Sequence, residues 1–288
     1  IEEDETTGQV TASASGKDGS LSGAVVELPY PSVGATENAV FAAVAAEGES
    51  FLSGCAREPE VAALCHMLNR MGARIFGIGT SRLRITGGLP LHGCTVRAEG
   101  DRIAAGTYLI AAAAAGGEIE ISGICSGELS SLTSLLEEGG AVLYREPRRI
   151  YLRQDRPFRR ICVKTGPYPD FPTDLQSPLL ALMSVSGGGL VEETVFESRF
   201  KTAQELNKMG ASVTVLGQRA EIKEGRCLRG CRVRACDLRG GAALVTAGLT
   251  AEGRTLVEQS EYISRGYEDI CRDLSRLGGK LRYCGTDT

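Results

Sequence analysis

The stretch LNKMGASV at residues 206–213 decides the fold, because its pattern of helix, glycine and strand occurs four times along the chain. The other copies are LNRMGARI (68–75), LEEGGAVL (136–143) and LSRLGGKL (274–281). Their aligned glycines, at positions 72, 140, 210 and 278, are separated by 68, 70 and 68 residues. A motif that recurs at equal spacing predicts an internal structural repeat.

The segments around each motif share one order of elements. A helix of small apolar residues comes first, ends at glycine, and leads into a β-rich segment such as EIEISG (118–123). The second helix is amphipathic, and a short hairpin such as ASVTVLGQRAEIKEG (211–225) follows it. The apolar positions at helical spacing in the first and last copies are Val61, Leu64, Cys65 and Leu68, and Ile270, Leu274 and Leu277. The predicted repeat is therefore βαβαββ.

The first helix of each repeat is almost entirely apolar, so we expect it to be buried on all sides, with helices inside and sheets outside. Buried helices still have free N–H groups at their N-termini, which caps, water or a ligand must satisfy. Several such N-termini around one cleft would bind an anion, and we therefore expect a phosphorylated ligand.

Composition excludes several other classes of protein. The net charge of −4 over 288 residues argues against nucleic-acid binding, which needs clustered basic residues. No apolar run is long enough for a membrane span, and the acidic start IEEDETTGQV does not resemble a signal peptide. Ten cysteines without a CxxC pair are typical of reduced thiols. The only histidines, His66 and His92, are expected at the surface, so we predict neither a metal site nor a cofactor.

The stretch TGPYPDFPTDLQSP (165–178) contains four of the ten prolines and comes just before an apolar run. Prolines at 167, 169 and 172 restrict the backbone and predict a stiff, extended approach to a helix. Thr173 and Asp174 then fall at the N-cap and first turn of that helix. Two interpretations of Asp174 remain open: a simple helix cap, or a base held in fixed geometry on a rigid loop.

Other polar residues also stand at predicted helix starts. YPSVGATEN (30–38) puts Ser32, Val33 and Gly34 ahead of a helix, where backbone N–H groups can hold a phosphate. An arginine in a first turn opposes the helix dipole, so Arg239 and Arg265 are expected to have another task. Such arginines fit bidentate capture of carboxylate or phosphate oxygens, although ordinary surface ion pairs remain the alternative.

Seven stretches of the chain occur in an order that resembles one family. They are YPSVGATEN, AREPE, DRIAAGT, FPTDLQ, ETVFESRF, DLRGGAAL and RGYE. Over essentially its whole length the chain is similar to the UDP-N-acetylglucosamine enolpyruvyl transferases, also called UDP-N-acetylglucosamine 1-carboxyvinyltransferases. The resemblance implies an α/β (α+β) fold, the inside-out α/β barrel built from βαβαββ repeats. The family has six repeats in two domains of three, with substrates bound between the domains, and four of the six are present here.

The resemblance also implies a function. The family transfers the enolpyruvyl group from phosphoenolpyruvate to the 3-hydroxyl of UDP-N-acetylglucosamine, the first committed step of peptidoglycan precursor synthesis. We therefore expect a cytoplasmic transferase that serves cell wall biogenesis, cell shape and cell division. Its expected partners are these two substrates, with no nucleic acid and no membrane.

Residue roles follow from the same resemblance. Asp174 matches the candidate general base near the sugar hydroxyl, Asp237 lies close to the enolpyruvyl group, and Arg265 holds phosphoenolpyruvate. Arg102 and Arg199 are expected to be structural ion-pair partners. The predicted substrate-binding residues are Ser32, Val33 and Gly34 for the diphosphate, Val195 and Phe196 for the uridine and sugar, and Leu238 and Arg239 for phosphoenolpyruvate.

The resemblance further implies how the chain divides. Residues 1–99 are expected to hold the last repeat of an incomplete barrel, after a hairpin left from a preceding repeat. Residues 100–288 are expected to form a three-repeat barrel. Because the first two repeats and their substrate contacts are missing, we expect the chain alone to be inactive. The first part would expose apolar surface unless self-association or the missing repeats cover it.

Two alternatives stay open. The first is 5-enolpyruvylshikimate-3-phosphate synthase, which shares the fold and the donor but would lack this combination of FPTD and RGYE. The second is a non-catalytic protein that binds a nucleotide sugar.

Overall fold

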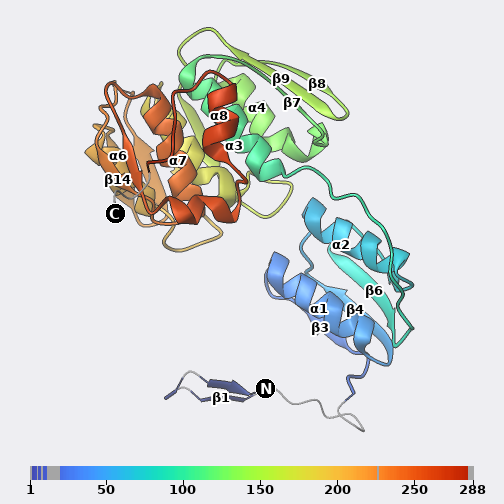
Figure 1. Ribbon diagram of the computed structural model, residues 1–288. Helices are drawn as coiled ribbons and strands as arrows, with labels where there is room; N and C mark the ends of the chain where they lie inside the picture. The colour runs from blue at the N-terminus through green and yellow to red at the C-terminus, as the bar shows by residue number, and fades with distance from the viewer. Residues whose placement is uncertain (1, 5, 8, 12–19, 226, 285–288) are drawn as a thin grey trace. The chain divides into compact units, whose positions relative to one another are not determined.

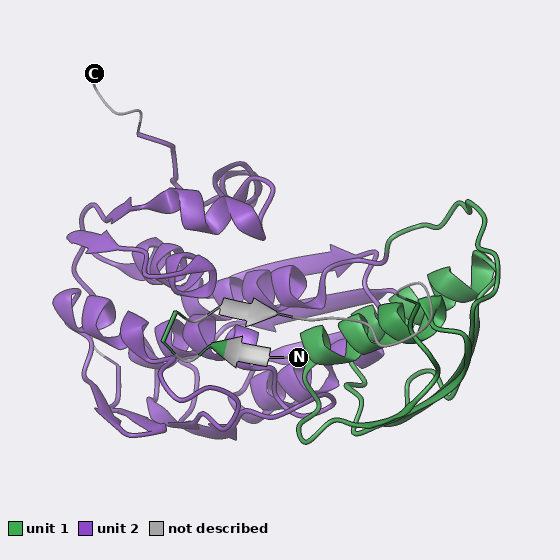
Figure 2. Ribbon diagram, turned by 90° about the horizontal axis from the view of Figure 1, so that it is seen from below, with its two compact units in different colours: residues 1–98 green, residues 99–288 purple. Residues whose placement is uncertain are grey.

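The computed structural model describes residues 2–4, 6–7, 9–11, 20–225 and 227–284. The chain divides into unit 1, residues 1–98, and unit 2, residues 99–288 (Figure 2). Each unit has a hydrophobic core of its own.

Unit 1 contains a hairpin followed by one full βαβαββ repeat. The hairpin pairs β1 (Glu2–Asp4) with β2 (Gln9–Thr11). The repeat consists of β3 (Val25–Glu27), α1 (Val33–Ala45), β4 (Gly48–Ser53), α2 (Pro59–Arg70), β5 (Arg74–Phe76) and β6 (Arg82–Gly87). Its sheet has the order β3-β4-β6-β5, in which β3 and β4 are parallel and the other pairs are antiparallel.

Unit 2 contains three further copies of the repeat. The first has α3 (Arg102–Ala115), β7 (Gly117–Ser122), α4 (Ser130–Glu138), β8 (Val142–Glu146) and β9 (Arg149–Gln154). The second has β10 (Ile161–Lys164), α5 (Gln176–Ser184), β11 (Gly189–Glu192), α6 (Lys201–Lys208), β12 (Val213–Leu216) and β13 (Arg219–Ile222). The third has β14 (Arg232–Arg234), α7 (Leu238–Thr250), β15 (Leu256–Glu258) and α8 (Ile270–Arg276).

The first helices of these three copies, α3, α5 and α7, pack against one another at the centre of unit 2 (Figure 1). All nine residues of α5 are buried. Gly106 permits the close approach of α3, because a Cβ there would lie 2.6 Å from Leu175 Cδ1. The sheets lie outside this helical core, so the fold is an inside-out α/β arrangement, as predicted.

The four glycines of the repeat motif share one backbone conformation. Gly72, Gly140, Gly210 and Gly278 have φ angles of 111°, 104°, 96° and 100°. Each lies just after the second helix of its repeat, where only a residue without a Cβ adopts this conformation readily. The motif that revealed the repeat is therefore a helix-ending signal.

The structure corrects three details of the predicted repeat. Helix α1 is not buried on all sides, since one face is exposed and Phe41 on it is 50% accessible. Leu277 does not continue the apolar stripe of α8, because the helix ends at Arg276 and Leu277 is 56% accessible. Among the described residues, the repeat at α3 lacks a first strand and the repeat at α7 lacks its hairpin.

The remaining general expectations concern the surface. His66 and His92 are exposed, as predicted, and all ten cysteines are free thiols. In the part of the chain that the structure describes, no helix is long and apolar enough to cross a membrane.

Candidate active site

Asp174 lies in a short 3-10 turn, Thr173–Leu175, directly before α5, and its carboxylate pairs with two arginines. Arg199 Nη2 donates to Asp174 Oδ1 at 2.6 Å, and Arg239 Nη2 donates to Oδ2 at 3.1 Å. Among the described residues, the recorded hydrogen bonds of the Asp174 carboxylate run to these two arginines and none runs to a backbone N–H of the first turn. The interpretation of Asp174 as only a helix cap is therefore wrong: each carboxylate oxygen is held by a guanidinium from a different part of unit 2.

The protonation of Asp174 reflects a balance of two effects. Burial raises the carboxyl pKa, but the charges and hydrogen bonds of Arg199 and Arg239 outweigh burial and hold the pKa below its ordinary value of 3.8. The Asp174 side chain keeps 37% of its surface accessible, whereas those of Arg199 and Arg239 keep 18% and 12%. Asp174 is thus an ionised carboxylate within reach of solvent, and a weak base while both arginines hold it.

Glu193 organises the other side of this cluster. It is fully buried at the end of β11, and its Oε1 accepts hydrogen bonds from the backbone N–H groups of Val195 (2.8 Å) and Phe196 (3.1 Å). Its Oε2 accepts from the hydroxyl of Thr173 at 2.8 Å. One carboxylate thereby ties the loop after β11 to the turn that carries Asp174.

Arg199 completes the connection on this side. Its Nη1 donates to Thr173 Oγ1 at 2.9 Å, and its guanidinium lies 4.9 Å from the ring centre of Phe196. The predicted residues Asp174, Val195 and Phe196 are therefore gathered in one place. Arg199 is an ion-pair partner, and the carboxylate it pairs with is that of the candidate base.

Arg239 is supported from the third repeat. Its guanidinium lies 5.8 Å from the ring centre of Tyr267, and the Tyr267 hydroxyl makes a 2.7 Å hydrogen bond with Thr107 Oγ1 in α3. Gly266 lies beside this pair and leaves room for the neighbouring Leu238 side chain, because a Cβ there would lie 2.9 Å from Leu238 Cδ2. The contacts bring together the N-terminal parts of α3 and α7 and the turn before α5, where helix dipoles favour negative charge.

Asp237, Leu238 and Arg265 lie beside this cluster and make other contacts. Asp237 caps α7, with its Oδ1 accepting from the backbone N–H of Gly240 at 2.7 Å. The Leu238 side chain packs beside Gly266. Arg265 is exposed and stacks on Tyr262 at 5.1 Å. Within the described residues, no recorded contact joins Arg265 to Asp174.

Ser32, Val33 and Gly34 form the N-terminal turn of α1 in unit 1. Ser32 is the N-cap, and its hydroxyl accepts from the backbone N–H of Ala35 at 3.3 Å. Gly34 is exposed, with no atom within 4 Å of the position that a Cβ would occupy. This turn has the open backbone that phosphate binding requires, and its role stays a prediction.

Sequence reasoning missed Glu193, Thr107 and Tyr267. Glu193 is the first residue of ETVFESRF (193–200), one of the seven stretches that carry the family resemblance. An acid that directly follows a strand is also a local signal for a capped turn. The pairing of Thr107 with Tyr267 joins residues 160 positions apart, so no local pattern reveals it. Among the described residues, no group of three or more histidine, cysteine or acidic side chains is placed to bind a metal ion.

Comparison with known proteins identifies the family. The family model for EPSP synthase (3-phosphoshikimate 1-carboxyvinyltransferase) matches residues 2–274. The chain belongs to this carboxyvinyltransferase family.

Curated relatives within the family carry another name. A protein of Novosphingobium aromaticivorans that is 43% identical over 273 residues is named UDP-N-acetylglucosamine 1-carboxyvinyltransferase. One of Carboxydothermus hydrogenoformans, 44% identical over 264 residues, is named UDP-N-acetylglucosamine 1-carboxyvinyltransferase 2. The alignments cover 94% and 91% of this chain but 64% and 63% of those proteins. The chain thus spans somewhat less than two thirds of the length of these relatives.

Solved structures agree on the fold. The enolpyruvyl transferase NikO from Streptomyces tendae superposes with a TM-score of 0.83 at 25% identity, over 91% of this chain and 66% of that one. An EPSP synthase from Acinetobacter baumannii reaches a TM-score of 0.67 at 19% identity, over 93% of this chain and 67% of that one.

Proposed function

We propose that this chain is the greater part of an enzyme that transfers the enolpyruvyl group from phosphoenolpyruvate to the 3-hydroxyl of UDP-N-acetylglucosamine. The support that carries the proposal is the name shared by relatives 41–44% identical to the chain. On this proposal the protein acts in the cytoplasm, in the synthesis of peptidoglycan precursors for the cell wall, cell shape and cell division.

In the proposed reaction, the sugar 3-hydroxyl oxygen bonds to C2 of phosphoenolpyruvate, and C3 takes up a proton. Asp174 accepts the proton that the hydroxyl loses. The tetrahedral ketal then loses phosphate from C2 and a proton from C3, which restores the double bond. A carboxylate in a turn braced by Pro172 suits this task, because general-base catalysis needs a fixed position within hydrogen-bond reach of the proton.

The arginine pairs of Asp174 suggest how binding and base strength are coupled. Phosphoenolpyruvate carries carboxylate and phosphate oxygens that compete with Asp174 for the guanidinium of Arg239. When Arg239 turns to the substrate, Asp174 loses one of the charges that depress its pKa. The carboxylate then becomes a stronger base only when the donor is bound. Arg265, exposed and paired only with Tyr262 among its recorded contacts, is available for the same anion.

Calorimetry on the 288-residue chain tests the proposal. We expect binding of UDP-N-acetylglucosamine and no binding of 3-phosphoshikimate. The reverse preference would favour the EPSP synthase alternative, and binding of neither acceptor would contradict the proposed substrate.

A phosphate-release assay with phosphoenolpyruvate then separates an enzyme from a binding protein. For this chain by itself we expect binding without turnover, since it spans less than two thirds of its relatives. Turnover by the purified chain would support the proposed reaction and show the expectation of inactivity to be wrong. If a protein of the relatives' full length that contains this chain also bound the sugar without releasing phosphate, the non-catalytic alternative would hold.

A further inference from the structure

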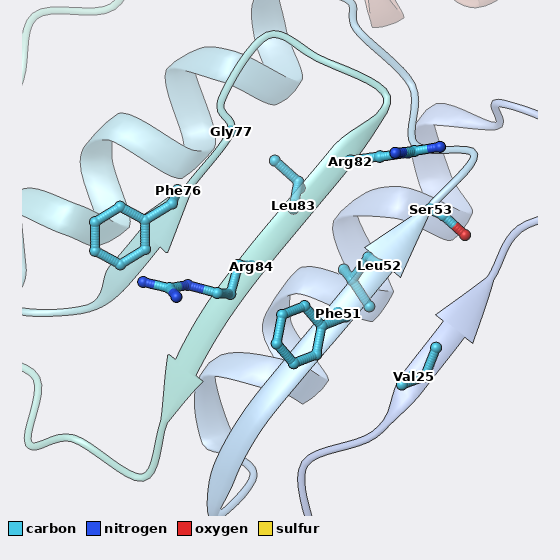
Figure 3. Close-up of a pocket in the computed structure, with 9 residues that line it drawn as sticks. All are labelled: Val25, Phe51, Leu52, Ser53, Phe76, Gly77, Arg82, Leu83 and Arg84. Carbon is cyan, nitrogen blue, oxygen red and sulfur yellow. The ribbon is translucent and has the colours of Figure 1, made fainter.

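Within the described residues of unit 1, helices cover only one face of the four-stranded sheet (Figure 3). Helices α1 and α2 cover that face, where Leu52, Leu83 and Ile85 are buried. On the uncovered face, which we call the outer face, apolar side chains remain accessible: Val25 at 82%, Phe51 at 46% and Phe76 at 51% (Figure 3).

These side chains form a row across all four strands. Val25 is paired with Phe51, Phe51 with Arg84, and Arg84 with Phe76. The Arg84 guanidinium lies 4.9 Å from the ring centre of Phe76. A hollow of 260 Å³ lies among them, below the usual range of about 300–1,000 Å³ for small-molecule pockets. Its size and openness suit protruding side chains better than a metabolite.

The charges on either side of this row are segregated by strand. Glu27 on β3 and Glu49 on β4 lie on one half of the outer face. Arg82 on β6 and Arg74 on β5 lie on the other half, each in register with one of the glutamates. All four are exposed, and no ion pair of any of them is recorded within the described residues. The outer face is therefore acidic along one edge and basic along the other.

A surface with this pattern is complementary to itself under one kind of two-fold rotation. An axis parallel to the strands places β3 of one copy over β5 of the other, and β4 over β6. Each glutamate then faces the arginine half of the second copy, and Phe51 packs over Arg84. An axis across the strands would instead place glutamates beside glutamates and arginines beside arginines, which is unfavourable.

We propose that the outer face binds a second copy of this chain, in a symmetric dimer whose two-fold axis runs parallel to the strands. Two sheets packed face to face in this way lie about 10 Å apart. Four strands spaced by about 4.8 Å make a narrow interface, smaller than the roughly 800 Å² per partner of stable complexes. We therefore infer a weak, reversible dimer, favoured by low salt because charge pairs contribute to it.

Sedimentation velocity of the 288-residue chain, from micromolar to hundreds of micromolar concentration, tests the proposal. We expect a reversible monomer–dimer equilibrium that weakens as salt rises. Phe51→Ser should raise the dimer dissociation constant about tenfold or more, because it removes a central aromatic contact. Circular dichroism should show unchanged folding, since the replaced side chain is half exposed. A chain that stays monomeric throughout would overturn the proposal.

The matched control is Phe41→Ser, which removes an equally exposed phenylalanine from α1, outside the outer face. It should leave the dissociation constant unchanged. If Phe41→Ser abolishes association and Phe51→Ser does not, the copies meet elsewhere and the proposal fails.

Charge reversal tests the axis itself. Glu49→Arg and Arg74→Glu should each weaken self-association, and an equimolar mixture of the two variants should recover dimers through complementary halves. Failure of the mixture to associate better than either variant alone would rule out the proposed orientation.

Discussion

At the scale of single residues, the central feature is a carboxylate held by two guanidiniums. The sequence predicted both Asp174 and Arg239 as site candidates. Asp174 stands among prolines at a helix start, and Arg239 stands in a first turn, where its charge opposes the helix dipole. Their pairing across 65 residues was not predictable, since it depends on how α5 and α7 pack. The role of Tyr267 was not predictable for the same reason, because its partner Thr107 lies 160 residues away. Glu193 differs, because it accepts hydrogen bonds from the nearby backbone N–H groups of residues 195 and 196, and an acid directly after a strand is a local signal for such a turn.

Asp174→Asn should leave the fold intact and weaken its stability by about 1 kcal/mol at neutral pH. In a fully buried site, losing two charged hydrogen bonds would lower the free energy of unfolding by more than this. The Asp174 side chain is 37% accessible, so solvent screening makes the loss smaller. In a protein that turns over, the same change should remove most activity, because an amide cannot accept the proton. Urea unfolding and phosphate release are the measurements, and full activity would refute the role as base.

The stability difference between wild type and Asp174→Asn should also depend on pH. A pKa depressed in the folded state stabilises it above the unfolded-state pKa, near 3.8, and this contribution disappears as pH falls through the lower folded value. We therefore expect the full difference above about pH 5 and a vanishing one in stronger acid. The control is Asp170→Asn, which removes an exposed acid from the same loop; among the described residues no ion pair of Asp170 is recorded.

Glu193→Ala should destabilise unit 2 by about 2–3 kcal/mol, because two backbone N–H groups and the Thr173 hydroxyl lose their acceptor. Glu193→Gln retains one oxygen acceptor and should cost clearly less. Thermal unfolding gives the comparison, and hydrogen exchange at residues 195 and 196 should increase in the alanine variant. Equal stability of both variants would show that Glu193 does not organise the loop.

At the scale of elements, the sequence predicted those features that depend only on neighbouring residues. The glycines after the second helices and the short hairpins follow directly from backbone preferences. Burial of the first helices was predictable only in part. Helix α5 has neighbours on every side, whereas α1 has an equally apolar sequence and an exposed face. Composition shows that a helix can be buried, and only packing shows whether it is.

The approach of α3 to its neighbours gives a prediction at this scale. Gly106→Ala should destabilise unit 2 by about 1–2 kcal/mol, because the new methyl group would lie 2.6 Å from Leu175 and 3.0 Å from Leu132 side-chain atoms. Gly34→Ala in α1 is the comparison, since nothing lies within 4 Å and alanine favours a helix. Thermal unfolding should therefore show a lower melting temperature for Gly106→Ala and a higher one for Gly34→Ala than for the wild type. Destabilisation by both substitutions would contradict the packing argument.

At the scale of the whole molecule, two units with separate cores are joined by residues 89–101, which have no helix or strand. The fourfold repeat was readable from spacing alone, because each copy carries the same helix-ending motif. The spacing did not predict which repeats share a hydrophobic core, because that depends on contacts between helices of different repeats.

Limited trypsin digestion should cut first after Arg97, which is exposed in this connecting segment. Cleavage should release a fragment that begins at residue 98 and resists further digestion, because its central helices are buried. Mass spectrometry of the products over time gives the order of cuts. Earlier cleavage inside unit 2, or persistent protection of Arg97, would contradict the division of the chain.

The joint packing of α3, α5 and α7 bears on how the protein is made. These helices begin at residues 102, 176 and 238, so the centre of unit 2 joins segments that are far apart in the chain. During synthesis, the earliest of them must wait on the ribosome until the last has emerged. Topologies of this kind fold slowly and expose apolar helices in the meantime. An interior assembled from such distant parts therefore delays the burial of its first helix until the last one has been synthesised.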